Sequence, residues 1–112
     1  MARGGAIDLG TLSARLVLER PVETPDGQGG VEGGFAALAT VWAQIEPVSA
    51  RAEEAAGVLP VTVTHRIRLR HRSDLASGMR LRRGARLFVI RAFRDPDETG
   101  RYTLCDCEEI KP

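Results

Sequence analysis

The hydrophobic and polar positions of this 112-residue chain alternate most regularly in residues 60–72. Every second residue there is apolar or histidine, and the residues between them are threonine or arginine. A period of two is the repeat of a β-strand, whose successive side chains point to opposite faces. We therefore predict one long strand with an inner face in an apolar core. Its outer face would carry a row of four arginines, Arg66, Arg68, Arg70 and Arg72.

Similar but shorter patterns predict the other strands. They cover residues 12–20, 35–46, 79–82, 87–93 and 101–109. Residues 49–57 are expected to form a short helix, because Ser49 can cap its first turn and Gly57 can end it. Five or six strands, one brief helix and no alternation of strands with helices predict a mostly β fold. The expected architecture is a small antiparallel β-barrel or sandwich.

Glycine and proline interrupt this pattern in residues 21–34, which contain five glycines, Pro21 and Pro25. We expect a long Gly-rich extended loop there, which is mobile by itself and becomes ordered only when it docks on another surface. Residues 1–10 are also small and Gly-rich, and we expect a flexible N-terminus. The length of the chain suits a single domain over residues 1–112.

Charge is divided unevenly along the chain, although the net charge is only +1. Between Val61 and Arg94 there are ten arginines and one acid, Asp74, whereas the rest of the chain is mainly acidic. Regions of opposite sign can pair within one fold or between copies in a ring. A row of arginines repels itself unless an anionic group lies against it. The candidate acidic partner surface consists of Glu53, Glu54, Asp95, Asp97 and Glu98.

Few residues suggest catalysis, a cofactor or a metal. His65 and His71 fall on the inner face of the long strand, where a hydrogen-bonded structural imidazole is expected. Cys105 and Cys107 are two residues apart on one strand, a spacing that favours two buried or half-buried thiols over a disulfide. We predict a protein that is not an enzyme and holds no cofactor or metal ion. Trp42, the only tryptophan, is expected to be a structural anchor in the core or at its rim.

The chain shows neither an apolar run of membrane-spanning length nor the hydrophobic region of a signal peptide at its start. We therefore expect a protein that is made and kept in the cytoplasm.

The order of several motifs is distinctive. Residues 41–49 read Val-Trp-Ala-Gln-Ile-Glu-Pro-Val-Ser, and a short acidic helix is expected after them at 51–56. The alternating arginines follow in residues 64–70, and then Met79-Arg80. Residues 84–90 read Gly-Ala-Arg-Leu-Phe-Val-Ile. In this order they resemble the head-closure, or head–tail joining, proteins of tailed bacteriophages and of phage-derived gene transfer agents. The resemblance covers residues 12–109. Residues 21–34 depart from the family pattern.

The resemblance implies a β-barrel subunit without catalytic residues. Such subunits form a homo-oligomeric ring, the stopper, in the neck of the virion, between the portal-adaptor protein and the tail-terminator or tail-tube protein. The ring seals packaged DNA in the head, offers a docking surface to the tail and later lets the DNA pass. The resemblance also implies assembly in the bacterial cytoplasm, with no membrane partner.

An OB-like nucleic-acid-binding β-barrel is the alternative reading. In that case the arginine row would follow the phosphates of a nucleic acid. Such barrels also stack bases on exposed aromatic rings, and this chain has few aromatic residues to spare. All are expected in or near the core: Phe35, Trp42, Phe88, Phe93 and Tyr102. We therefore favour the ring subunit.

Overall fold

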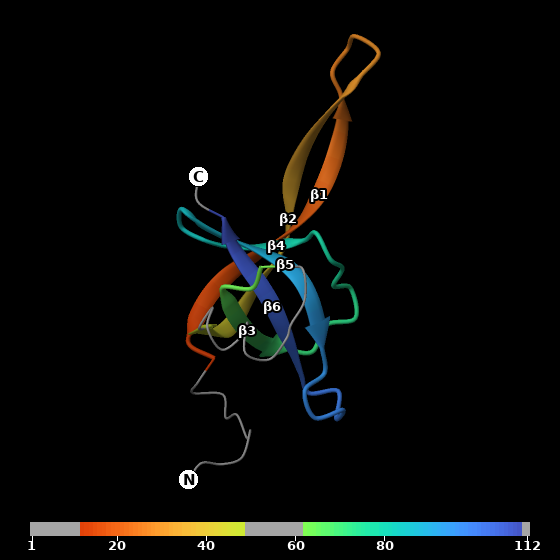
Figure 1. Ribbon diagram of the computed structural model, residues 1–112. Coiled ribbons are helices and arrows are strands. Elements are labelled where there is room, and N and C mark those ends of the chain that lie inside the picture. The colour runs from red at the N-terminus through yellow and green to blue at the C-terminus, as the bar shows by residue number, and fades with distance from the viewer. Residues whose placement is uncertain (1–11, 49–61, 111–112) are drawn as a thin grey trace.

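The fold is a closed antiparallel barrel of six strands (Figure 1). It is known from a computed structural model that describes residues 12–48 and 62–110. The strands are β1 (Ala14–Pro25), β2 (Val31–Pro47), β3 (His65–Arg70), β4 (Arg80–Arg83), β5 (Arg86–Arg94) and β6 (Tyr102–Ile110). Around the barrel they follow the order β1-β2-β3-β6-β5-β4. The predicted mostly β class and antiparallel barrel are confirmed.

The predicted helix at 49–57 and the flexible N-terminus at 1–10 lie outside the described residues. Within the described ranges the chain forms no helix. The described ranges therefore contain no helix that could cross a membrane.

The core follows directly from the alternation. On β1 the inner positions are Leu16 and Leu18, and on β3 they are Ile67 and Leu69, all 0–1% exposed. The later strands contribute five more fully buried side chains, Leu81, Phe88, Ile90, Cys105 and Cys107. Because both ends of the strand order join, every strand of the barrel buries one face and leaves the other on the surface.

Strand β3 is shorter than the predicted strand over residues 60–72. Within the described part of the chain it runs only from His65 to Arg70. Its two neighbours limit it, because β2 ends at Pro47 opposite His65 and β6 begins at Tyr102 opposite Arg70. Single hydrogen bonds continue past both ends, from the Thr64 N–H to the Cys107 carbonyl (2.8 Å) and from the His71 N–H to the Arg101 carbonyl (2.9 Å).

Strands β1 and β2 continue beyond the barrel as a two-stranded arm, defined here as residues 21–35 (Figure 1). The expectation of a loop without regular structure is wrong for most of this segment, because Pro21 pairs with Phe35 and Pro25 pairs with Val31. A tight turn closes the arm. Asp26 Oδ1 accepts hydrogen bonds from the backbone N–H of Gln28 (2.7 Å) and of Gly30 (3.1 Å). The turn needs glycine at 27 and 29, whose φ angles are +82° and +87°.

Candidate assembly surface

The arginine row lies on the outside of the barrel, as predicted. Ile67 and Leu69 point into the core, so the alternate residues Arg66, Arg68 and Arg70 point outward. Arg72 lies beyond the end of β3 and does not continue the strand. The row therefore consists of three arginines on a strand and one in the following turn.

Two members of the row are neutralised within the subunit. The Arg66 Nε donates to Asp106 Oδ1 on the neighbouring strand β6 (3.1 Å). Arg94 donates to the other oxygen of the same carboxylate (2.8 Å). Arg72 forms a two-pronged pair with Asp74, at 2.9 and 2.7 Å, which lowers the pKa of that carboxyl. Charge-assisted pairs of this kind satisfy both charges locally.

Arg68 and Arg70 differ from the other two. Within residues 12–48 and 62–110 neither lies at ion-pair distance from a carboxylate. Their cross-strand neighbours are uncharged, since Arg68 lies opposite Leu104 and Arg70 opposite Tyr102 on β6. Two adjacent guanidinium groups without an acidic partner form a surface suited to an anionic ligand or partner.

Trp42 shares a hollow with Arg70 on the outside of the barrel, so of the two positions expected for it, the core and its rim, the core is wrong. Its side chain belongs to the outer face of β2, because Val41 and Ala43 on either side of it are buried, and it is 53% exposed. The ring lines an open hollow of about 340 Å³. The other residues of this hollow are Thr40, Val41, Arg70, His71 and Arg72.

The other aromatic residues also depart from the expectation. Only Phe88 is fully buried, whereas Phe35 and Phe93 are 38% and 40% exposed and Tyr102 is half-buried. Apart from Phe88, the core is built from aliphatic side chains and the two cysteines. The shortage of exposed rings, which weighed against a nucleic-acid surface, is therefore not present.

The acidic residues Asp95, Asp97 and Glu98 lie together in the turn between β5 and β6. Asp95 accepts hydrogen bonds from the backbone N–H of Gly100 (2.6 Å) and of Asp97 (3.3 Å). Desolvation raises the pKa of Asp95, but these bonds outweigh it and the pKa is lowered overall. Glu98 adopts a left-handed conformation with φ of +60° at this turn. Glu53 and Glu54 lie outside the described residues.

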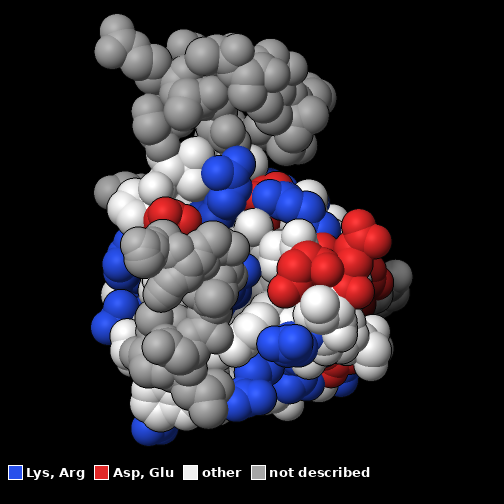
Figure 2. Space-filling model, turned by 90° about the horizontal axis from the view of Figure 1, so that it is seen from below, with Lys and Arg blue, Asp and Glu red and all other residues white. Residues whose placement is uncertain are grey.

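Four further arginines, Arg80, Arg82, Arg86 and Arg91, pair with acids of the same barrel. The uneven charge along the chain allowed such pairs but did not locate them. Arg86 pairs with Glu109 and Arg91 with Glu108, both across strands β5 and β6. On the face shown in Figure 2, acidic side chains gather mainly in one patch and basic side chains lie in others. Pairing within the fold has thus used much of the charge. Within the described residues six arginines form no ion pair: Arg68 and Arg70 on β3, and Arg15, Arg20, Arg83 and Arg101 elsewhere.

Glu19 is a buried carboxylate that the sequence pattern did not reveal. A bulge between Leu18 and Glu19 shifts the register of β1 against β2. Glu19 is 6% exposed and accepts hydrogen bonds from Arg80 (2.6 Å) and Arg82 (2.8 Å) on β4. Desolvation raises its pKa, but the two guanidinium groups outweigh this effect and lower it. These bonds tie β1 to β4 at the base of the arm.

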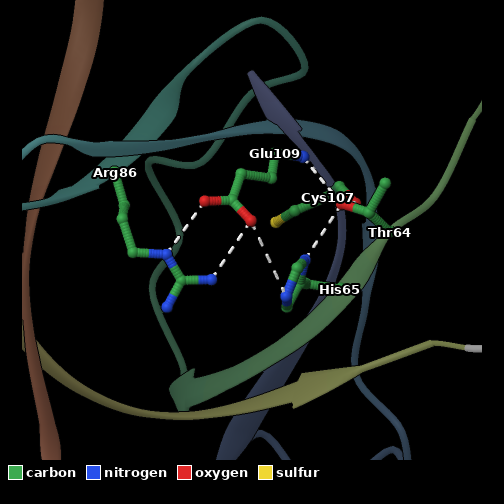
Figure 3. Close-up of polar contacts among 5 residues, drawn as sticks. All are labelled: Thr64, His65, Arg86, Cys107 and Glu109. Carbon is green, nitrogen blue, oxygen red and sulfur yellow. Dashed lines mark hydrogen bonds and ion pairs between the residues drawn. The ribbon is translucent and has the colours of Figure 1, made fainter. Parts of the chain in front are cut away.

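His65 forms part of a polar cluster where β3 begins (Figure 3). Its Nδ1 lies 2.9 Å from the Thr64 hydroxyl, and its ring meets Phe88 edge-on at 5.1 Å. Glu109 lies 4.0 Å from His65 Nε2 and also pairs with Arg86. The prediction of a hydrogen-bonded structural imidazole is confirmed for His65. His71, in contrast, is exposed because it follows the last residue of β3.

Both cysteines are buried free thiols on the inner face of β6, as predicted. Burial raises the pKa of Cys105 to about 12 and that of Cys107 further, so both remain protonated. Among the residues that the structure describes, no cluster of His, Cys, Asp and Glu could hold a metal ion.

Comparisons with known proteins agree with this geometry. A family model described as phage head completion protein matches residues 7–110. A chain of the virion of a native gene transfer agent particle is 30% identical, with a TM-score of 0.63, and the match covers 89% of this chain and 96% of that one. Protein SF1141 from Shigella flexneri 2a is 24% identical, with a TM-score of 0.73, and the match covers 92% of this chain and 96% of that one. This similarity shows a shared fold. No curated protein matches the chain.

Proposed function

The chain belongs to the phage head completion proteins, and from this premise we propose that it is the stopper subunit of a phage-like particle. It forms a homo-oligomeric ring in the neck, between the portal-adaptor protein and the tail-terminator or tail-tube protein. The ring seals packaged DNA in the head, provides the tail docking surface and later lets the DNA pass. Assembly takes place in the bacterial cytoplasm.

The observation that supports a side-chain interface is the surface formed by Arg68, Arg70 and Trp42. The closed barrel leaves few backbone groups for contacts between subunits, so the barrels must meet through side chains. An exposed tryptophan near two arginines that have no acidic partner within residues 12–48 and 62–110 has the composition of an interface hot spot. Buried there, the two arginines would pair with carboxylates of a neighbour.

The acidic turn between β5 and β6 supplies such carboxylates on every copy of the chain. Asp95 and Asp97 accept hydrogen bonds within the turn, and Glu98 lies beside them without a cation partner among the described residues. A ring repeats one heterologous contact, in which a basic surface of each copy meets an acidic surface of the next. We assign Arg68 and Arg70 to the basic side and this turn to the acidic side, with Glu53 and Glu54 as further candidates.

The double variant Arg68→Glu/Arg70→Glu tests the assignment. Neither side chain enters the core, so the variant should fold and melt within a few degrees of the wild type. Reversing two charges at a docked interface should abolish ring formation and give heads that lose their DNA. The assay is complementation of a deletion strain, with particle yield and head DNA content as readouts. The single variant Arg68→Glu is compared with Arg83→Glu as a matched charge-reversal control, because Arg83 is exposed on the distant strand β4. Arg83→Glu should assemble normally, whereas Arg68→Glu should assemble less well.

A nucleic-acid-binding barrel is the second candidate. The exposed Trp42, which shares a hollow with Arg70, and the half-buried Tyr102 opposite Arg70 favour it more than the sequence did. In that case binding to DNA would weaken with salt, with a slope of about 3 to 4 in a plot of log affinity against log salt concentration. Normal assembly of the double variant, together with loss of a salt-sensitive DNA affinity shown by the wild type, would contradict the ring interface and support this candidate.

A further inference from the structure

The two edges of the arm are chemically different. In an antiparallel ribbon, pairs that exchange backbone hydrogen bonds alternate with pairs whose N–H and C=O groups point outward. The Asp26 N–H donates to the Gly30 carbonyl (3.1 Å), which marks this pair as hydrogen-bonded. Counting along the register, the outward-pointing pairs are Pro25 with Val31, Glu23 with Gly33, and Pro21 with Phe35.

The outer edge of β1 is blocked along the arm. Two of its three outward positions are proline, at 21 and 25, and proline has no N–H to donate. Prolines at such positions prevent another strand from adding to an edge. This edge of the arm is therefore unsuited to pairing with a further strand.

The outer edge of β2 is open. Val31, Gly33 and Phe35 each point an N–H and a C=O away from β1, and along residues 31–35 no other described strand pairs with this edge. Space is available on both faces, because a Cβ placed on Gly33 or on Gly34 would meet nothing within 4 Å. A strand added here can place large side chains over the two glycines.

Apolar side chains beside this edge are also uncovered. Val31 is 61% exposed and Phe35 is 38% exposed, with the guanidinium of Arg80 stacked 3.8 Å from the Phe35 ring centre. An isolated two-stranded ribbon is marginally stable in water. A third strand would cover these side chains and satisfy the outward backbone groups at once.

The charge of the arm identifies the kind of strand that fits. Residues 21–35 contain three acids, Glu23, Asp26 and Glu32, and no lysine or arginine. A second arm from another copy would bring the same charge and be repelled. We propose that the β2 edge of the arm binds an extended segment of a neighbouring neck protein by strand addition, and that this segment is basic with alternate bulky apolar residues. The inference rests on the proposed function and adds the partner chemistry of the arm.

A pair of proline variants tests the proposal. Gly33→Pro removes the central outward N–H of the open edge and leaves the hydrogen bonds between β1 and β2 intact. Glu23→Pro is the matched control, because it changes the opposite residue on the edge that is already blocked. Each variant is expressed in a strain that lacks the wild-type gene, and mass spectrometry measures the number of copies of the variant per purified particle. We expect about tenfold fewer copies of Gly33→Pro than of the wild type per particle. This is the size of effect expected when one buried carbonyl of the partner strand is left without its hydrogen-bond donor. Glu23→Pro should be incorporated normally.

Hydrogen exchange of the wild type provides a second measurement that needs no variant. The amides of residues 31–35 should exchange quickly in the purified chain and slowly in particles. Normal incorporation of Gly33→Pro, equal loss with Glu23→Pro, or unchanged exchange in particles would each overturn strand addition. A purified dimer that Gly33→Pro converts to monomer would show a second copy as the occupant and overturn the assigned partner. Absence of the wild-type chain from particles would instead contradict the proposed head-completion function.

Discussion

Trp42 shows how one residue can belong to a strand without belonging to its core. The neighbouring strand β1 places Arg15 directly opposite it, and the end of β3 brings Arg70 to the same hollow. The ring is thus supported from the sides and open to solvent above. A large apolar group held in this way contributes little to the isolated subunit and much to a complex that covers it.

Replacing Trp42 by alanine should therefore leave the fold nearly intact. We expect a loss of at most about 1 kcal/mol in the free energy of unfolding, because more than half of the side chain is already in water. Phe88→Ala, at a fully buried ring, should cost about 3–5 kcal/mol. Chemical denaturation measures both values. Collapse of the Trp42→Ala fold would mean that the ring supports the barrel itself.

His65 gives the barrel a dependence on pH. Burial lowers the pKa of His65, an effect that the nearby Glu109 opposes and Arg86 reinforces. The unfolded chain then binds the proton more readily, with a pKa near 6.5. The stability gained from the neutral imidazole is present above about pH 6.5 and is lost as the pH falls through that value towards the folded pKa.

We expect the wild type to lose more stability than His65→Phe when the pH is lowered from 7.5 to 5.5. Comparing the two pH slopes removes the effect of the substitution on overall stability. Urea denaturation at each pH provides the values. Parallel slopes for the two proteins would show that His65 does not titrate differently in the folded and unfolded states.

At the level of elements, the turn of the arm depends on one carboxylate. Asp26 accepts hydrogen bonds from the backbone N–H groups of Gln28 and Gly30. These two bonds lower the pKa of the Asp26 carboxyl group. The turn is remote from the core, so loosening it should open the arm locally and leave global unfolding unchanged.

Asp26→Ala should make the arm amides exchange faster and expose residues 26–30 to protease, with a melting temperature close to that of the wild type. Asp26→Asn keeps a side-chain oxygen as acceptor and serves as the control. A lowered melting temperature in Asp26→Ala would show that the arm and the barrel unfold together.

The sequence predicted the elements unequally, for identifiable reasons. The alternation of apolar and polar residues located the barrel strands to within a few residues. The same alternation places Trp42 on the face opposite its neighbours Val41 and Ala43, which are buried, so Trp42 points outward. The arm was missed because glycine is common in loops, although Gly33 and Gly34 here lie in a paired strand. The pairing of β3 with β6 could not be predicted, because periodicity identifies a strand and not its partner.

For the whole molecule, the distribution of charge matters more than its sum. Acids on β1 and β6 neutralise arginines on β3, β4 and β5, which fixes neighbouring strands to one another around the barrel. Among the described residues, the charge that remains for partners includes Arg68 and Arg70 on β3 and the acidic turn that follows β5. The arm adds a third surface, which uses backbone groups instead of charge.

Closure of the barrel also has a consequence for how the chain reaches its native state. Strand β6 must find β3, whose pairing residues lie more than thirty positions earlier, and β4 must return to β1 before every strand has two neighbours. Contacts between distant parts of a chain form slowly, so we expect folding on the millisecond-to-second scale, slower than for helical proteins of this size. Newly made subunits would then pass through an open sheet before they become competent to assemble.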